Sequence, residues 1–487
     1  MKRVCFALAM TAVASGSLAA QQTAPKPTAK ASSLDRTKRP TVGAAPIFKV
    51  PTWSVDTLSN GVRLIVVEKH ALPLVSLSIH FDGGTDQLGT KAGVAQFVGS
   101  MLREGTASRT ADQLNNDLAL LGNQVSFGVG NESGVAGFSS SLTRTFNQTL
   151  DIMLDMMLHS TFPAPPLERL RTQALSGYLR GQDVVGVIAS QVTPKLLYGE
   201  LPYGRVVNDD DLKAVTRDDV AMLAKQFFVP ANATAYVVGD ITRAEAKVKL
   251  EKAFTVWPKS GAKLAVQYSE APAPGLTTIY LVDMPNKPQS QLVLARTGAP
   301  EYSPDMPTVD VMNAIMGGMF QSRLNANIRE ARGYSYGFGS RMSWQKGPGS
   351  LRAQGAVTRE KTDSSLLEAM KEIRGMTGAI PITTDELTAA KNSLTLSLPS
   401  RIQSIDGIAS VVSRIVDNDL PKDWWAQYIA GVNATSAADV STAAKRYMDP
   451  DHLAIVIVGD AAMIEAAVRA TGIAPVVKLD KAGKKLP

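Results

Sequence analysis

The chain has 487 residues, of which 45% are hydrophobic and 20% are charged, with 38 Gly and 27 Pro. These proportions are ordinary for a globular protein and exclude a disordered, collagen-like or coiled-coil chain. The formal net charge is +7, of which residues 1–19 carry +2, residues 20–47 carry +4 and residues 478–487 carry +3. Residues 48–477 are therefore left with −2, and a nucleic-acid-binding function loses its support.

The first 19 residues have the pattern of a secretory signal peptide. Lys2 and Arg3 precede an apolar run over residues 4–14, and small residues follow up to Ala19 and Ala20. The run is too short to span a bilayer, and cleavage after Ala19 removes the only cysteine, Cys5. We therefore expect export, most simply to a bacterial periplasm, of a cysteine-free chain with no transmembrane segment. Residues 20–47 are rich in Ala, Pro, Thr and Lys and are expected to be a disordered lead-in.

Two segments repeat with an offset of 220 residues. Residues 216–240 and 436–460 align without gaps, and 8 of 25 positions are identical, including the closing Gly239-Asp240 and Gly459-Asp460. Each copy predicts a capped helix, a proline turn and a buried strand. The repeat predicts two homologous domains.

Strand patterns such as residues 74–81 and 291–295 alternate with longer helical patterns, which favours an α+β class with helices covering a sheet. A stretch rich in Pro, Gly and Ala separates the two copies of the repeat and has the composition of a linker. The predicted divisions are 48–257 for the N-terminal domain, 258–275 for the linker, 276–477 for the C-terminal domain and 478–487 for a basic tail.

Residues 92–103, AGVAQFVGSMLR, predict a helix that packs on a core. Val94, Phe97, Val98, Met101 and Leu102 have the spacing of one helix face. The other face presents Gln96, Gly99, Ser100 and Arg103. Glycine inside a helix costs roughly 1 kcal/mol relative to alanine, so Gly99 is an unusual choice.

Residues 93–106, GVAQFVGSMLREGT, resemble the zinc helix of the insulinase and mitochondrial-processing-peptidase (pitrilysin) metallopeptidase family. The family pattern is G-x-A-H-F-L-E-H-M-x-x-x-G-T, and the resemblance extends over nearly all of residues 48–475. It implies two homologous domains, each a mostly antiparallel sheet covered by helices, in a clam-shell arrangement.

The resemblance also shows a loss. In the family, two histidines and a later glutamate bind zinc, and a glutamate between the histidines activates water. Those positions are Gln96, Ser100, Gly177 and Gly99 in this chain. Neutral amide and hydroxyl oxygens are poor zinc ligands. The four histidines, His70, His80, His159 and His452, are scattered, and none lies three or four residues from another. We expect no catalytic zinc and no other cofactor in this chain.

The second half carries a different motif. Residues 317–339, GGMFQSRLNANIREARGYSYGFG, predict a helix broken near Gly317-Gly318, a helix end at Gly333 and a strand start over residues 334–338. Arg329 lies at a helix end and Tyr336 just past the turn, so a chain reversal can aim both donors into one cleft. The stretch resembles the family's C-terminal motif, which implies that Arg329 and Tyr336 hold the substrate carbonyl as it becomes an oxyanion. The spacing alone also permits a purely structural role for both residues.

Two other patterns are open to a functional interpretation. Residues 333–337, GYSYG, match the G-x-S-x-G elbow of serine hydrolases, but here a helix precedes the serine and a strand follows, which is the wrong order. Residues 127–142 predict a Gly-rich hairpin, which is either ordinary or an edge that accepts an extended peptide.

These observations predict a catalytically incomplete, non-zinc subunit of a periplasmic zinc protease. Its expected partners are a zinc-bearing paralogous subunit, which holds the metal, and a peptide or unfolded polypeptide. Arg329 and Tyr336 would act in the partner's site. The alternative is a non-enzymatic scaffold or peptide-binding protein derived from the same family.

Overall fold

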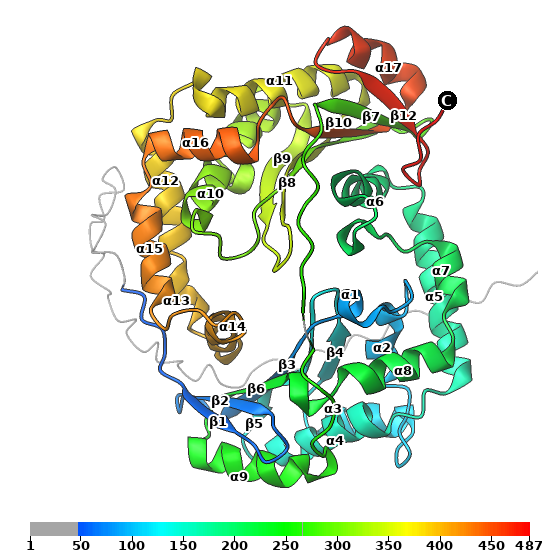
Figure 1. The fold of residues 1–487 in the computed structure, drawn as a ribbon, viewed down its shortest axis with the longest axis vertical. Helices are drawn as coiled ribbons and strands as arrows, with labels where there is room; N and C mark the ends of the chain where they lie inside the picture. Colours follow the sequence, from blue (N-terminus) through cyan, green and yellow to red (C-terminus); the bar gives the residue numbers. More distant parts are fainter. Residues whose placement is uncertain (1–46, 265) are drawn as a thin grey trace, which may run out of the picture. The chain divides into compact units, whose positions relative to one another are not determined.

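A computed structural model describes residues 47–264 and 266–487 of the chain (Figure 1). The predicted signal peptide, residues 1–19, and all but the last residue of the predicted lead-in, 20–47, lie outside the described residues. The described part contains two six-stranded sheets, one built from residues before 240 and the other from residues after 277. This arrangement confirms the predicted α+β class.

The first sheet is mostly antiparallel. Its strands, in spatial order, are β1 (Ser54–Thr57), β2 (Arg63–Glu68), β6 (Ala233–Gly239), β3 (Leu74–Asp82), β5 (Ser133–Leu142) and β4 (Val125–Val129). Only β2 and β6 pair in parallel. The β4–β5 hairpin confirms the one predicted over residues 127–142, and it places β4 at an edge of the sheet.

The second sheet repeats this plan with one change. Its strands, in spatial order, are β12 (Val476–Leu479), β7 (Thr278–Asp283), β11 (Ala454–Gly459), β8 (Gln289–Thr297), β10 (Ser350–Thr358) and β9 (Ser335–Ser343). The outer strand β12 pairs in parallel with β7, whereas β1 pairs antiparallel with β2. Because β12 includes Lys478 and Leu479, the predicted basic tail begins inside a strand, which corrects the boundary at 477.

The repeat found in the sequence is a repeat of structure. Helix α8 (Arg217–Phe227) is capped by Thr216 and precedes β6, and helix α16 (Ala437–Tyr447) is capped by Ser436 and precedes β11. Both caps are reciprocal, since the hydroxyl accepts from the backbone of an aspartate three residues later and that carboxylate accepts from the cap. These findings confirm the predicted helix, turn and strand in both copies.

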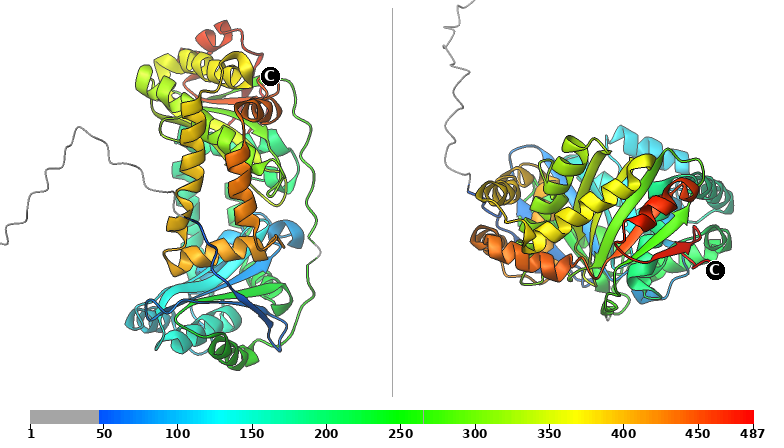
Figure 2. Two further views of the ribbon diagram at one scale, coloured as in Figure 1. Left: turned by 90° about the vertical axis from the view of Figure 1, so that its left-hand side faces the viewer. Right: turned by 90° about the horizontal axis from the view of Figure 1, so that it is seen from above.

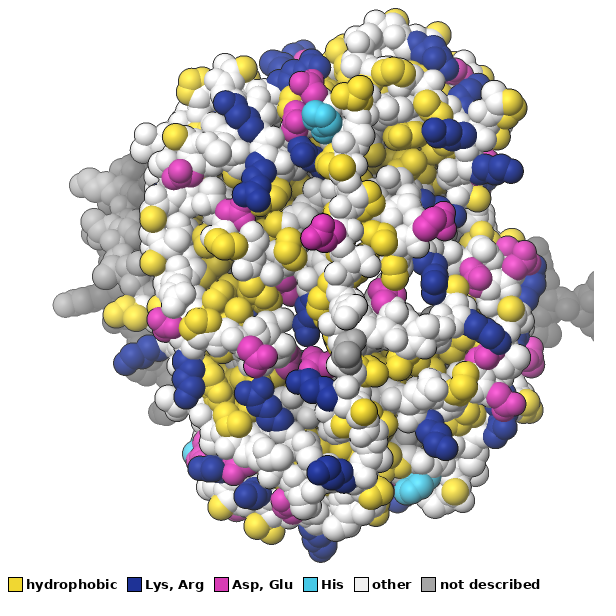
Figure 3. Space-filling view, viewed as in Figure 1, with side chains coloured by type: hydrophobic (Ala, Val, Ile, Leu, Met, Phe, Trp, Pro, Cys, Tyr) yellow, Lys and Arg dark blue, Asp and Glu magenta, His cyan; other side chains and the backbone are white. Residues whose placement is uncertain are grey.

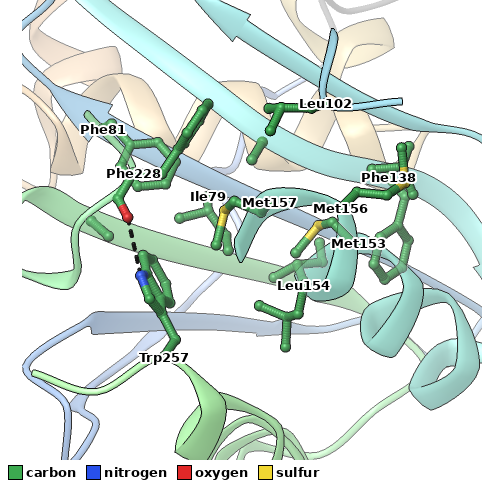
Figure 4. Packing of buried hydrophobic residues seen from close by; sticks show 14 of the residues in the cluster. Ile79, Phe81, Leu102, Phe138, Met153, Leu154, Met156, Met157, Phe228 and Trp257 are labelled. Carbon is green, nitrogen blue, oxygen red and sulfur yellow. Dashed lines mark hydrogen bonds between the residues drawn. The ribbon is translucent and has the colours of Figure 1, made fainter. Parts of the chain in front are cut away.

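Helices cover one face of each sheet and build its core. On the first sheet they are α2 (Ala95–Met101), α3 (Ala111–Leu120), α4 (Phe146–His159), α5 (Ala164–Gly181), α8 and α9 (Arg243–Ala253). Figure 4 shows methionines of α4 beside Phe138 and Ile79, and Trp257, whose indole N–H donates to the Phe228 carbonyl at 3.1 Å. The buried aromatic and methionine side chains fix how α2 and α4 lie on this sheet.

On the second sheet the covering elements include α10 (Met306–Asn313), α11 (Thr362–Arg374), α12 (Thr384–Thr395), α15 (Trp424–Ala434), α16 and α17 (Ala461–Ala470). Helix α11 lies across the strands when this sheet is seen from above (Figure 2, right). None of the described helices is long and apolar enough to cross a membrane.

Each half also contributes one helix to the other half's sheet. Helix α6 (Val185–Tyr198) packs on β8 and β11, and helix α14 (Ile405–Val416) packs on β6 and β3. The two helices are equivalent under the 220-residue offset, because Ile188, Ala189 and Val192 of α6 correspond to Ile408, Ala409 and Val412 of α14. These exchanged helices bury apolar surface that ties the two halves together.

Candidate functional site

Helix α2 forms within the segment that resembles the family's zinc helix, and it is shorter than the predicted helix over residues 92–103. Its buried side chains are Phe97, Val98 and Met101, as the apolar spacing predicts. Gly93 has a φ of +84°, which is not helical, so the helix can begin only after this residue. Gln96 and Ser100 are exposed on the opposite face.

Gly99 allows α2 to lie directly on the edge strand β4. A Cβ atom at this position would overlap the carbonyl oxygen of Phe127. The close approach accounts for a glycine inside the helix, which the sequence marked as unusual without giving its cause. A glutamate, which the family resemblance places here, does not fit this packing.

Gly177 has the opposite surroundings, although α5 packs against α2. It is exposed, and a Cβ atom added there would meet no atom within 4 Å. Space for a side chain therefore remains at the position of the family's third ligand, while the ligand itself is missing.

These four positions do not fit a zinc ion. They offer one amide, one hydroxyl and no side chain at Gly99 and Gly177, and zinc prefers imidazole, thiolate and carboxylate. Within residues 47–264 and 266–487 no group of three or more His, Cys, Asp or Glu side chains is arranged to hold a metal. Each of the four histidines instead lies beside an aspartate: His70 by Asp240, His80 by Asp417, His159 by Asp155 and His452 by Asp449.

The segment after α2 is held in place by an aspartate of α4. Asp155 of α4 accepts hydrogen bonds from the Thr106 hydroxyl at 2.8 Å, the Ser108 hydroxyl at 2.9 Å and Arg109 Nη1 at 2.6 Å. Burial raises the pKa of Asp155, but the hydrogen bonds from these groups lower it more, and the pKa lies below its ordinary value. Thr106, which closes the family-like segment, has a structural role in this turn.

The second half has a matching junction of helix and edge strand. Helix α10 continues into the π-helical segment η4 (Ala314–Gly318), and the chain becomes extended at Met319, close to the predicted break. A Cβ atom at Gly317 would overlap the backbone nitrogen of Ser340 on β9, which is an edge strand like β4. Close packing against an edge strand is therefore common to both halves.

Arg323 fixes the segment that follows. Its side chain is 8% exposed, and Nε and Nη2 donate to the two carboxylate oxygens of Glu386 at 2.6 and 2.9 Å. Nη2 also donates to the Pro381 carbonyl at 2.9 Å. This two-pronged ion pair holds the beginning of the motif against the start of α12.

Arg329 is much less constrained. It lies in the π-helical segment η5 (Asn325–Ala331), and its guanidinium carbon is 4.5 Å from the ring centroid of Phe320. Its Nη1 lies 3.2 Å from Glu330, at the surface. Phe320 is itself 66% exposed, so the cation–π pair is a surface feature. The sequence did not indicate this aromatic partner, because its ring contact depends on the break at Met319.

Tyr336 is 93% exposed on β9, after the turn at Gly333, whose φ is +65°. The predicted helix end and strand start are thus confirmed. No hydrogen bond joins Arg329 and Tyr336 within the part of the chain that the structure describes. Tyr336 is exposed and Arg329 is half-buried, and their role in substrate binding stays a prediction.

Ser335 supports the exclusion of a serine hydrolase. Its hydroxyl donates to the Ala356 carbonyl at 2.6 Å across the β9–β10 ladder, and it accepts from the Gly337 N–H at 3.1 Å. A helical segment precedes it and a strand follows, as the sequence predicted. The hydroxyl hydrogen-bonds where the register of β9 and β10 shifts, and this contact is structural.

A pocket beside α14 was not predicted from the sequence. It has a volume of about 650 Å³ and lies between β3, the β4–β5 hairpin and α14. His80 Nδ1 lies 2.6 Å from Asp417, the residue that follows α14, and this aspartate also accepts from the Tyr236 hydroxyl. Arg414 of α14 is 3.3 Å from Glu301. Its lining residues are spread from position 80 to position 418, so no local motif marks it. Paired charges and hydroxyls suit hydrogen bonding to a polar ligand such as a peptide backbone.

The charges on one face of the molecule agree with the near-neutral body. On the face shown in Figure 3, Lys and Arg side chains alternate with Asp and Glu, and no large patch of one sign is present. This face therefore lacks the basic patch on which nucleic-acid binding depends.

Comparison with known proteins supports the resemblance seen in the sequence. Residues 214–394 match the family described as "Peptidase M16 inactive domain". The chain is 23% identical to the uncharacterized zinc protease YmxG of Bacillus subtilis over 367 residues, which cover 75% of this chain and 87% of that protein. It is 21% identical to the mitochondrial-processing peptidase subunit beta of Lentinula edodes over 428 residues, which cover 84% of this chain and 90% of that protein.

The fold has a close counterpart among solved structures. The crystal structure of a peptidase M16 inactive domain from Pseudomonas fluorescens superposes with a TM-score of 0.76 at 24% identity. The match covers 84% of this chain and 98% of that chain. These findings show that residues 214–394 match the M16 inactive-domain family and that the chain has an M16-like fold, in agreement with the resemblance of its degenerate zinc helix.

Proposed function

We propose that this chain is the non-zinc subunit of a periplasmic M16 protease heterodimer. The observation that carries the proposal is a contrast. The zinc-ligand positions hold Gln96, Ser100 and Gly177, and β4 leaves no room for a side chain at Gly99. Arg329 and Tyr336 are retained, Arg329 half-buried and Tyr336 exposed.

In this proposal the zinc-bearing partner subunit holds the metal and carries out hydrolysis. Arg329 and Tyr336 donate hydrogen bonds to the substrate carbonyl, where negative charge develops. Donors fixed toward such a charge contribute several kcal/mol to a barrier. Arg323 and Glu386 hold the motif from which Arg329 projects.

The test is coexpression with the nearest M16 relative from the same genome that has an intact zinc helix. Each chain alone and the mixture are assayed for peptide cleavage, and the purified single chain is assayed for zinc. We expect cleavage by the mixture only, with no stoichiometric zinc in this chain. Zinc in this chain, or cleavage by it that survives chelation controls, would end the proposal.

Export is tested separately. N-terminal mass spectrometry of the chain recovered from a periplasmic fraction should find a mature end after Ala19 or Ala20. An intact Met1 in the cytoplasmic fraction would contradict the periplasmic assignment.

A second candidate is a non-enzymatic scaffold or peptide-binding protein. It is favoured by the match of residues 214–394 to an inactive-domain family. Full activity of the mixture with Arg329→Ala and Tyr336→Phe, or full activity of the relative alone without co-elution, would favour this candidate over the protease pair.

A further inference from the structure

A small pocket in the second half contains a buried arginine without a matching acceptor. The pocket has a volume of about 200 Å³ and lies where the end of α6 meets β7, β8, the beginning of β11 and residues 272–276. It is separate from α2, from Arg329 and from the larger pocket beside α14. We call it the Arg296 pocket.

Arg296 extends from β8 and its side chain is 17% exposed. Its Nη1 is buried and has no hydrogen-bond partner within the described residues. Burial also lowers the pKa of Arg296, although the guanidinium stays charged. A buried charged donor without an acceptor is costly, so native structures nearly always provide a partner.

The nearest carboxylate does not serve as this partner. Asp449 Oδ2 lies 3.8 Å from Arg296 Nη1, beyond hydrogen-bond distance. The same oxygen lies 2.6 Å from His452 Nδ1, and Oδ1 accepts from the Asp451 N–H at 3.1 Å. No acidic residue is among the described residues that line the pocket. The cation therefore faces a pocket without an anion of its own.

The rest of the wall is mixed. Leu196, Pro272, Leu276 and Leu453 supply apolar surface, and Tyr280, Thr297 and His452 supply two hydroxyls and an imidazole. At about 30 Å³ for each water in the liquid, the volume holds on the order of seven water-sized groups. A carboxylate with four or five carbon atoms fills such a space, and a nucleotide or sugar phosphate does not.

We propose that the Arg296 pocket binds a carboxylate carried on a short apolar body. The planar guanidinium pairs with the two carboxylate oxygens, and the leucine and proline side chains cover the carbon chain. The carboxylate has two possible sources, a free short-chain acid and the C-terminal residue of a peptide. The proposal does not depend on the proposed protease partnership.

The first experiment uses matched ligands on the purified full chain. Isovalerate, isovaleramide, the peptide Gly-Gly-Leu and its C-terminal amide are titrated by calorimetry. We expect isovalerate to bind and isovaleramide to bind at least tenfold more weakly. Binding of the free-acid peptide but not of its amide would extend the site to peptide C-termini. Binding of isovalerate alone would restrict it to free acids.

Variants then assign the site. Arg296→Met should weaken isovalerate binding at least tenfold. Arg352→Met is the matched control, because Arg352 is also a largely buried arginine of this sheet and does not line the pocket. Asp449→Asn removes the competing carboxylate and should tighten binding about threefold. It also tests the proposal if Arg296→Met fails to fold.

No heat or thermal shift with isovalerate at tens of millimolar would overturn the proposal. So would equal binding of the acid and the amide, or a loss of binding in Arg352→Met with no loss in Arg296→Met.

Discussion

The two halves of this protein bring a helix and an edge strand together in the same way, but they differ in the polar groups they present. In the first half, Gly99 of α2 lies on β4. In the second half, Gly317 at the end of the α10 segment lies on β9. Near the first junction in sequence lie Gln96 and Ser100, which are neutral, and near the second lie the charged Arg329 and the phenol of Tyr336. At the first junction the zinc ligands are missing and the packing of Gly99 on β4 also leaves no room for the glutamate. Restoring the family's side chains one at a time would therefore not restore a metal site.

The largest effect is expected when the family's glutamate is put back. Gly99→Glu should destabilise the protein by about 4 kcal/mol or more, because a Cβ atom overlaps the Phe127 carbonyl and α2 must move away from β4. Gly177→Glu is the matched control, with open space and a gain in helix propensity, and it should change stability by less than about 1 kcal/mol. Urea unfolding measures both. Equal losses of stability in the two variants would contradict the conclusion that Gly99 is crowded and Gly177 is not.

Next come two arginines of the second-half motif, Arg323 and Arg329. Arg323→Ala should cost about 3 kcal/mol, because it leaves Glu386 without its partner in a largely buried pair. Arg329→Ala should cost less than about 1 kcal/mol, since its contacts with Phe320 and Glu330 lie at the surface. Thermal and urea unfolding of both variants check this. A large loss of stability in Arg329→Ala would assign that residue a structural role.

The same anchor predicts a dependence on acid. Burial raises the pKa of Glu386, but hydrogen bonds from Arg323 and from the Thr383 N–H lower it more, so the folded-state pKa lies below its ordinary value. Its contribution to stability is therefore present above the unfolded-state pKa of about 4.3 and is lost as the pH falls through the folded value. Glu386→Gln should reduce the slope of unfolding free energy between about pH 5 and pH 3. An unchanged slope would show that other carboxylates account for the acid sensitivity.

The smallest change in stability is expected for the double variant Gln96→His/Ser100→His. Both positions are exposed on α2, so the free energy of unfolding should stay within about 0.5 kcal/mol of the wild type. Two histidines one turn apart should bind Zn²⁺ weakly, with no peptide hydrolysis, because no carboxylate stands at 99 or 177. Zinc titration and a peptidase assay measure both outcomes. Peptide cleavage by this variant alone would contradict the account of Gly99.

Much of the fold was predictable because its signals are local. The caps at Thr216 and Ser436, the apolar face of α2 and the Gly333 turn each depend on neighbours a few residues away. The repeat then required two related sheets. The exchange of α6 and α14 was not predictable, because an apolar helix face does not reveal which sheet covers it.

The candidate site was predictable only in part. The residues at 96, 99, 100 and 177 and the pair Arg329 and Tyr336 follow from motifs, and the structure gives their exposure and contacts. The overlap of Gly99 with Phe127, the ring of Phe320 under Arg329 and the pocket beside α14 join distant positions. Single-sequence patterns carry no record of such contacts.

The most direct test of the central claim is a titration of the zinc-bearing relative with this chain, followed by peptide cleavage and by size-exclusion chromatography. We expect the cleavage rate to rise from background and to saturate at a 1:1 ratio of the two chains. With Arg329→Ala the complex should still form, while the saturating rate falls about 100-fold. A rate independent of this chain, or a complex whose rate is unchanged by Arg329→Ala, would contradict the claim that the subunit supplies part of the active site.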